Sequence, residues 1–191
     1  MTKGVAQLLH CRKGVKRASG MAILVSLAIM TGALQGCASP ATQQGMTVTP
    51  SMVERTNDTF KHAIRIDSVA GGKDTNPLWT SQVGTEDFKK ALTDSLGNAG
   101  YLASSDDQAK YALSANFLEL DQPLIGLTLD VKSSVQYQLK GNGLDKSIPV
   151  RATGTAGFSD AAIAIARLRI ASERSILENI KELLRQLADI R

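Results

Sequence analysis

The chain of 191 residues has little of what most catalytic and cross-linking chemistry requires, since it holds two cysteines and two histidines. Cys11 lies among basic residues and Cys37 stands at the end of an apolar run, so an internal disulfide framework is not expected. His62 comes with no hydrolase motif, no metal-ligand spacing and no phosphate-binding loop. We therefore expect a surface or strand-end histidine, no metal site and no enzyme.

A long hydrophobic run is also missing. Five basic residues lie between Lys3 and Arg17, and fourteen largely apolar residues follow from Met21 to Leu34. A membrane-spanning helix needs about 20 apolar residues. A basic segment, a short apolar segment and small residues after it are typical of a secretory signal.

The quartet Leu34, Gln35, Gly36 and Cys37 resembles the lipobox of bacterial lipoproteins. The resemblance implies that signal peptidase recognises Leu34, Gly36 and Cys37, that Cys37 carries a covalent lipid, and that the mature chain begins there. No dissociable cofactor is expected. Two acyl chains are enough for stable membrane anchoring. Ala38, in place of the aspartate that commonly retains such proteins in the inner membrane, implies the outer membrane with the domain facing the periplasm. The alternative is an ordinary secreted protein cut near Cys37.

The positive net charge of +4 belongs to the signal segment. From residue 37 onward the chain has 17 basic and 18 acidic side chains, because five of the 22 basic residues come earlier. We therefore expect no nucleic-acid partner.

The sequence predicts three segments: a signal peptide over 1–36, a lipidated end with a flexible tether over 37–58, and a periplasmic α+β domain over 59–191. Residues 38–58 are rich in Ser, Thr, Gln, Pro and Gly without a sustained apolar period. Their expected root-mean-square reach is roughly 25 Å.

The domain itself is predicted as β-α-β-β-β-α. A short strand contains Ile64 and Ile66, and Thr85 is the expected N-cap of a helix that ends before Gly100. Period-two alternation then predicts three strands joined as an antiparallel meander. Their expected inner residues include Leu127 and Phe158, and a change of phase near Phe117 and Leu118 indicates either a bulge or the end of that strand. A final helix enters between Asp160 and Arg167 and runs to about Asp189.

The final helix has apolar residues seven apart, namely Ile163, Ile170, Leu177 and Leu184, with Ile180 and Leu187 in the intervening step and Ile176 and Leu183 on the same side, and together these predict its buried stripe. Both helices are expected on one face of the sheet, an α+β architecture. The other face, with Thr128, Ser134, Gln136, Gln138, Thr153 and Thr155, should be polar and open.

Three features are candidate contact surfaces. Trp79 is a typical partner anchor, although it could instead fold back on the helix start. Leu124 and Ile125 occupy a connection that should be polar; they are either a tip that touches lipid or a partner, or the rim of the core. Arg167, Arg174 and Lys181 repeat every seven residues, as in a solvated face with intrahelical ion pairs; acidic lipid is the other reading.

The lipobox, the segment FKKALTDSLGNAGYL, the amphipathic hairpin and the closing RLRIASERSILENIKELLRQL together resemble two groups of envelope lipoproteins. These are the accessory lipoprotein of the lipopolysaccharide-inserting barrel and the auxiliary lipoproteins of ABC-type lipid transporters. The resemblance implies a non-enzymatic accessory module in envelope assembly or lipid transport, with an envelope protein or glycolipid as partner. The alternatives are an envelope acyltransferase or hydrolase, and a structural tether or stress lipoprotein without a ligand.

Overall fold

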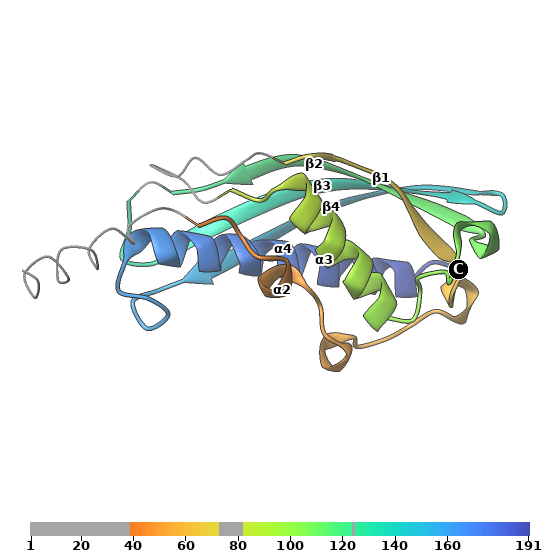
Figure 1. Ribbon diagram of the computed structural model, residues 1–191, viewed down its shortest axis with the longest axis horizontal. Helices are drawn as coiled ribbons and strands as arrows, with labels where there is room; N and C mark the ends of the chain where they lie inside the picture. Colours follow the sequence, from red (N-terminus) through yellow and green to blue (C-terminus); the bar gives the residue numbers. More distant parts are fainter. Residues whose placement is uncertain (1–38, 73–81, 124) are drawn as a thin grey trace, which may run out of the picture. The chain divides into compact units, whose positions relative to one another are not determined.

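Four strands form one sheet in the computed structural model, which describes residues 39–72, 82–123 and 125–191 (Figure 1). The strands lie in the order of the chain: β1 (Ile64–Gly71), β2 (Tyr111–Asp121), β3 (Leu129–Gly141) and β4 (Leu144–Ala156). The predicted antiparallel meander is confirmed for β2, β3 and β4. β1 adds to it in parallel with β2, so the whole sheet is mixed.

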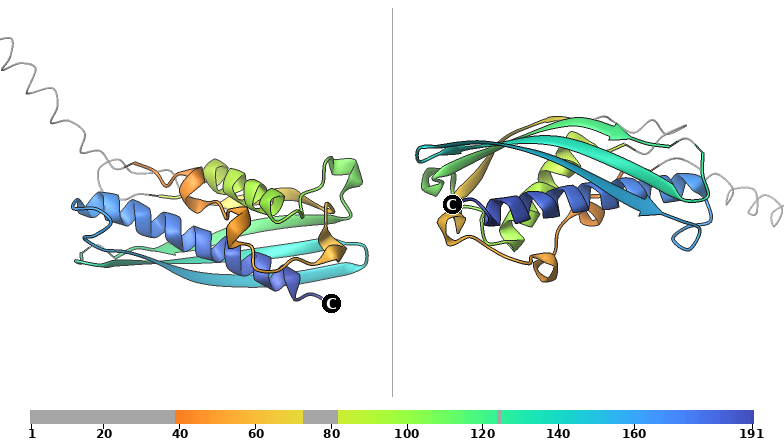
Figure 2. Two further views of the ribbon diagram at one scale, coloured as in Figure 1. Left: turned by 90° about the horizontal axis from the view of Figure 1, so that it is seen from below. Right: turned by 180° about the vertical axis from the view of Figure 1, so that it is seen from behind.

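Two long helices, α3 (Thr85–Asn98) and α4 (Ala164–Ala188), lie on the same face of the sheet (Figures 1 and 2). The short helices are α2 (Gln43–Met46), η2 (Pro50–Met52), η3 (Asp58–Phe60) and η4 (Asp106–Gln108). The predicted α+β class and helix placement are confirmed.

α3 follows its apolar sequence pattern, but the predicted N-cap is wrong: Gly84 is the N-cap residue and Thr85 is the first residue of the helix. Phe88, Leu92 and Leu96 are buried at helical spacing, and Gly100 ends the helix with a φ of 72°. The Tyr101 N–H returns to the carbonyl of Leu96 at 2.9 Å, which closes the helix end. Such left-handed positions favour glycine because it has no Cβ.

The buried face of α4 agrees with the predicted stripe at Ile176, Ile180, Leu183, Leu184 and Leu187, and differs from it at three positions of the seven-residue series. Ile163 is 68% exposed, and Ile170 and Leu177 are only partly buried. The buried side chains instead recur at three and four residues: Leu168, Ala171, Ser172, Ser175, Ile176, Asn179, Ile180, Leu183, Leu184 and Leu187. A straight α-helix has 3.6 residues per turn, so a strict seven-residue spacing drifts off the contact face.

Small residues bring α4 close to β4. A Cβ added at Gly154 would lie 2.1 Å from the Ser175 nitrogen and 2.2 Å from the Ala171 oxygen. Nothing larger than glycine fits here without a shift of helix or strand.

A buried polar cluster joins α4 to the sheet; it consists of Ser133, Tyr137, Ser175 and Asn179. The Tyr137 hydroxyl donates to Asn179 Oδ1 at 2.9 Å, and Asn179 Nδ2 donates to the Val150 carbonyl at 3.2 Å. Ser175 Oγ donates to Ser133 Oγ at 2.9 Å. Burial raises the pKa of Tyr137, so the phenol stays a neutral donor. These directional bonds define where α4 lies along the sheet.

The predicted bulge in β2 is confirmed, since the pairing with β3 shifts between Phe117 and Glu119. The expected inward positions of Leu127 and Phe158 are wrong. The last pair of the β3–β4 hairpin is Leu129 with Ala156. Leu127 and Phe158 lie beyond this pair, and their side chains are 73% and 57% exposed. The alternation of apolar and polar residues continues in the sequence beyond the last hydrogen-bonded pair of β3 and β4, so this pattern predicts strands that are too long.

The expectation of a flexible tether through residue 58 is wrong for residues 39–58. Ala41, Met46 and Val48 are buried in the core, and the described residues belong to one folded unit, Ala38–Arg191. Val48 N–H donates to Ser95 Oγ and the Val48 carbonyl accepts from Asn98 Nδ2, both at 2.9 Å. A few long-range contacts hold this segment in place. Such contacts do not require regularly spaced apolar residues, so the sequence of the segment shows no helix or strand pattern.

Candidate functional site

The anchoring residues predicted from the sequence, Leu34, Gly36 and Cys37, lie outside the described residues, as do Trp79 and Leu124. Their roles therefore stay predictions. Ile125 is described and is 91% exposed, so the rim-of-core reading is wrong for it.

Hydrogen bonds hold the first described residues against the side of the domain that carries the helices. The Ala41 N–H donates to the Gln82 carbonyl at 3.1 Å. The Thr42 N–H and hydroxyl both donate to Glu173 Oε1 on α4, at 2.8 and 2.9 Å. Figures 1 and 2 show this segment running from the end of the domain where α4 begins toward α2. The ordered domain thus begins within four residues of Cys37.

The open face of the sheet is polar, as the sequence predicts. Its side chains pair across strands: Thr155 donates to Asp130 at 2.6 Å, and Gln136 donates to Ser147 at 2.9 Å. Arg65 and Asp67 form an ion pair at 2.8 Å. This face therefore presents polar and charged side chains that pair with one another across the strands.

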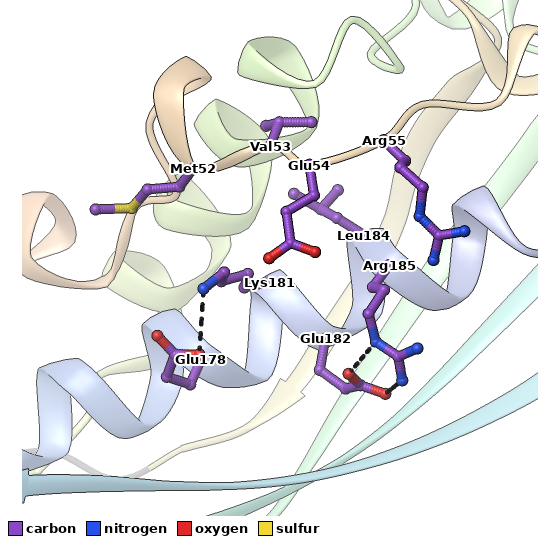
Figure 3. Close-up of a pocket in the computed structure, with 9 residues that line it drawn as sticks. All are labelled: Met52, Val53, Glu54, Arg55, Glu178, Lys181, Glu182, Leu184 and Arg185. Carbon is purple, nitrogen blue, oxygen red and sulfur yellow. Dashed lines mark hydrogen bonds and ion pairs between the residues drawn. The ribbon is translucent and has the colours of Figure 1, made fainter.

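A charged groove of about 220 Å³ lies between α4 and the segment after η2 (Figure 3). It is lined by Met52, Val53, Glu54, Arg55, Glu178, Lys181, Glu182, Leu184 and Arg185. Arg185 donates to Glu182 at 2.6 Å and holds the pKa of that carboxyl below its usual range. Lys181 lies 3.7 Å from Glu178. The groove is smaller than typical ligand pockets of about 300–1,000 Å³, and these charges are paired, so it does not define a catalytic site.

The side chain of His62 is exposed, and the residue precedes β1 with a φ of 49°. Its backbone N–H donates to the Gly100 carbonyl at 2.8 Å. It does not line the charged groove. Within residues 39–72, 82–123 and 125–191, no three or more His, Cys, Asp or Glu side chains gather as metal ligands. Of the helices in those ranges, none has the length and apolar character to span a bilayer.

The repeat of basic residues on α4 is not one solvated face. Lys181 makes the predicted intrahelical pair with Glu178, and Arg174 pairs with Asp160 at 2.7 Å. Arg167, however, is only 3% exposed. Its helical position faces the sheet, where the loops before β3 and after β4 cover it.

Arg167 is held by backbone carbonyls. Nη1 donates to the carbonyls of Ala161 and Ala162 at 3.0 and 2.9 Å, and Nη2 to that of Gly126 at 3.4 Å. The guanidinium lies 4.2 Å from the centroid of the Phe158 ring. Its buried Nε has no hydrogen-bond partner, and no carboxylate of the described chain forms an ion pair with it. No sequence pattern indicates the burial of Arg167, since an arginine at regular spacing on a helix is ordinarily solvated.

Four large side chains are exposed around Arg167, at the end where β3 and α4 begin and β4 ends. We call this set the apolar end: Ile125, Leu127, Phe158 and Ile163. Their exposed fractions are 91%, 73%, 57% and 68%. Met52 and Leu118, the other large apolar side chains exposed in the described chain, lie elsewhere, in η2 and on β2.

Fold and surface together define a class: an α+β domain with two helices on one face of a mixed sheet and a polar face opposite. No model of a known protein family matches the chain, and no curated protein matches it significantly in sequence.

Solved structures of similar fold include three bacterial proteins. One is a protein of Caulobacter crescentus regarded as a lipoprotein, with 19% identity, a TM-score of 0.46, and coverage of 69% of this chain and 91% of that one. A protein of Xanthomonas campestris has 11% identity, a TM-score of 0.43 and coverage of 67% and 86%. A lipoprotein of Neisseria meningitidis has 12% identity, a TM-score of 0.37 and coverage of 67% and 99%. At these values the likeness carries no argument about function.

Proposed function

We propose that the protein is a membrane-anchored lipoprotein, lipidated at Cys37 and exported to the outer membrane, that acts as a non-enzymatic accessory module in the periplasm. The observation that carries the proposal is the sequence Leu34-Gln35-Gly36-Cys37 directly before a folded unit whose described residues begin at Ser39. In this arrangement, cleavage before Cys37 removes the basic and apolar segment without cutting into the domain.

The short stretch of chain between Cys37 and the folded domain keeps the domain close to the membrane. Ala41, which is buried, is four residues after Cys37, and these four steps span at most about 14 Å. A lipid on Cys37 therefore holds the domain beside the bilayer, within reach of other proteins in the same membrane.

The polar face of the sheet is the surface on which we place the partner, an envelope protein or a glycolipid. It combines hydroxyl and amide side chains with few unpaired charges, and both helices lie on the opposite face. Envelope assembly or lipid transport is the process we infer, on the resemblance to accessory lipoproteins of those systems. The proposal includes no catalytic step, so His62→Ala should leave envelope integrity unchanged.

The anchor is tested by comparing Cys37→Ser with the matched variant Cys11→Ser in cells fed labelled palmitate. Wild type and Cys11→Ser should be labelled, processed and found with the membranes. Cys37→Ser should be unlabelled and unprocessed. Normal processing and membrane partitioning of Cys37→Ser would refute the proposal, because the thiol at position 37 would then have no role.

A further inference from the structure

We infer that the apolar end is a lipid-contacting surface, which lies against the anionic phospholipid headgroups of the bilayer that holds Cys37. The inference rests on the proposed function in that the anchor selects the bilayer. It goes further by assigning an orientation and a binding surface to the folded domain.

The first argument is the gathering of exposed apolar side chains. Leu127 and Phe158 leave the hairpin on adjacent strands just past the Leu129–Ala156 pair. Ile163 is the N-cap residue of α4, and Arg167 reaches the carbonyl of Gly126, next to Ile125. These residues therefore form one neighbourhood drawn from two loops and one helix. Exposed apolar clusters of this kind mark interaction sites.

The second argument is the length of chain between the anchor and the domain. Ser39 is two residues after Cys37, a span of at most about 7 Å. The described chain starts on the side of the domain where α4 begins (Figures 1 and 2). Thr42 is bound to Glu173, ten residues along α4 from Ile163, which is about 15 Å of helix. The lipid on Cys37 therefore attaches the domain to the bilayer at the end of the domain that carries Ile125, Leu127, Phe158 and Ile163.

The third argument is charge. Arg167 has no carboxylate partner in the described chain, and the positive end of the dipole of the 25-residue helix α4 adds to its field. Of the acidic residues that adjoin this end, Asp160 is paired with Arg174, Asp130 accepts from Thr155, and Asp121 lies opposite Lys132 in the β2–β3 ladder. Arg167 therefore places a positive charge without a carboxylate partner beneath an apolar surface, and this combination complements anionic headgroups above a hydrocarbon layer.

Photocrosslinking in the lipidated, membrane-bound chain tests the contact. A photoreactive amino acid replaces Leu127, and the matched control replaces Leu118, which is 58% exposed but lies on β2. We expect phospholipid adducts at position 127 and at least tenfold fewer at position 118. Equal labelling at the two positions, no adduct at 127, or an adduct to a protein at 127 would each overturn the inference.

Vesicle binding separates this inference from the anchor. The unlipidated domain, residues 38–191, contains its own core and forms one folded unit. Its binding to vesicles of phosphatidylcholine with phosphatidylglycerol should fall at least tenfold when Leu127, Phe158 and Ile163 are all changed to serine. Changing Met52 and Leu118 to serine should have less than a twofold effect. Vesicles of phosphatidylcholine alone should bind more weakly.

Two outcomes distinguish the failures. If Cys37 is lipidated but position 127 never contacts lipid, the inference fails and the proposed function stands. If the unlipidated domain binds vesicles through the apolar end but Cys37 is unmodified, the lipid-contacting surface is supported and the proposed anchor fails.

Discussion

Replacing Asn179 by alanine should destabilise the domain through the buried polar cluster. The change leaves the Tyr137 hydroxyl, which is fully buried, without an acceptor, and removes the donor to the Val150 carbonyl. Each buried group left without a partner costs about 1–3 kcal/mol. Alanine regains roughly 0.5 kcal/mol in helix propensity. The expected net loss in the free energy of unfolding is about 3 kcal/mol, or roughly 6–12 °C in Tm for a domain of this size.

The assay is urea unfolding of residues 38–191 followed by circular dichroism, with Asn116→Ala on the open sheet face as control. The control should change the free energy of unfolding by less than about 0.5 kcal/mol. A double-mutant cycle isolates the pair: Tyr137→Phe should cost less in the Asn179→Ala background than in wild type, with a coupling of about 1 kcal/mol or more. A coupling near zero would refute the reasoning, since the two side chains would then act independently.

Three other substitutions test particular contacts by Tm, its pH dependence or proteolysis. Gly154→Ala should destabilise by about 1–3 kcal/mol because its Cβ would overlap α4, whereas Gly97→Ala on α3 should stabilise by up to about 1 kcal/mol; destabilisation by both would count against the close approach. Hydrogen bonds from Arg174 and the Gly157 N–H hold the pKa of Asp160 below its usual range. Asp160 therefore contributes stability above its unfolded pKa of about 3.9 that is lost as pH falls through the folded value, and Asp160→Asn should lower Tm at pH 7 but not at pH 2. Glu173→Ala should speed tryptic cleavage after Arg55 several-fold, since Thr42 loses its acceptor, while Glu178→Ala should not; equal rates would show that Glu173 does not hold the segment.

Local patterns were enough to predict the strands, the two helices and the bulge. Period-two alternation identifies β2, β3 and β4 because each buries one side only. The parallel pairing of β1 with β2 could not be predicted in this way, because strand neighbours are selected by long-range packing. The docking of residues 39–58 was missed for a similar reason: Thr42 and Val48 bind residues 131 and 47 positions away.

The candidate site was predictable only in part. The lipobox is a local motif and was found directly, and Ile125 was singled out because an apolar residue in a hairpin connection is unusual. Leu127 and Phe158 were instead assigned to the core, since alternation alone does not show where a ladder ends. Arg167 was assigned to solvent because the loops that bury it are contributed by distant parts of the chain.

The most direct test of the account is the depth of the two ends of the domain in a bilayer. The mature lipidated chain should have no free thiol, because Cys11 is removed with the signal and Cys37 is modified, so one introduced cysteine takes one fluorophore. Ser159→Cys places it beside Phe158, and Asp107→Cys places it beyond the start of β2, whose 11 residues span about 33 Å. Quenchers attached to lipid should quench the label at 159 strongly and the label at 107 hardly at all. Equal quenching at both positions, or none at 159, would contradict the account.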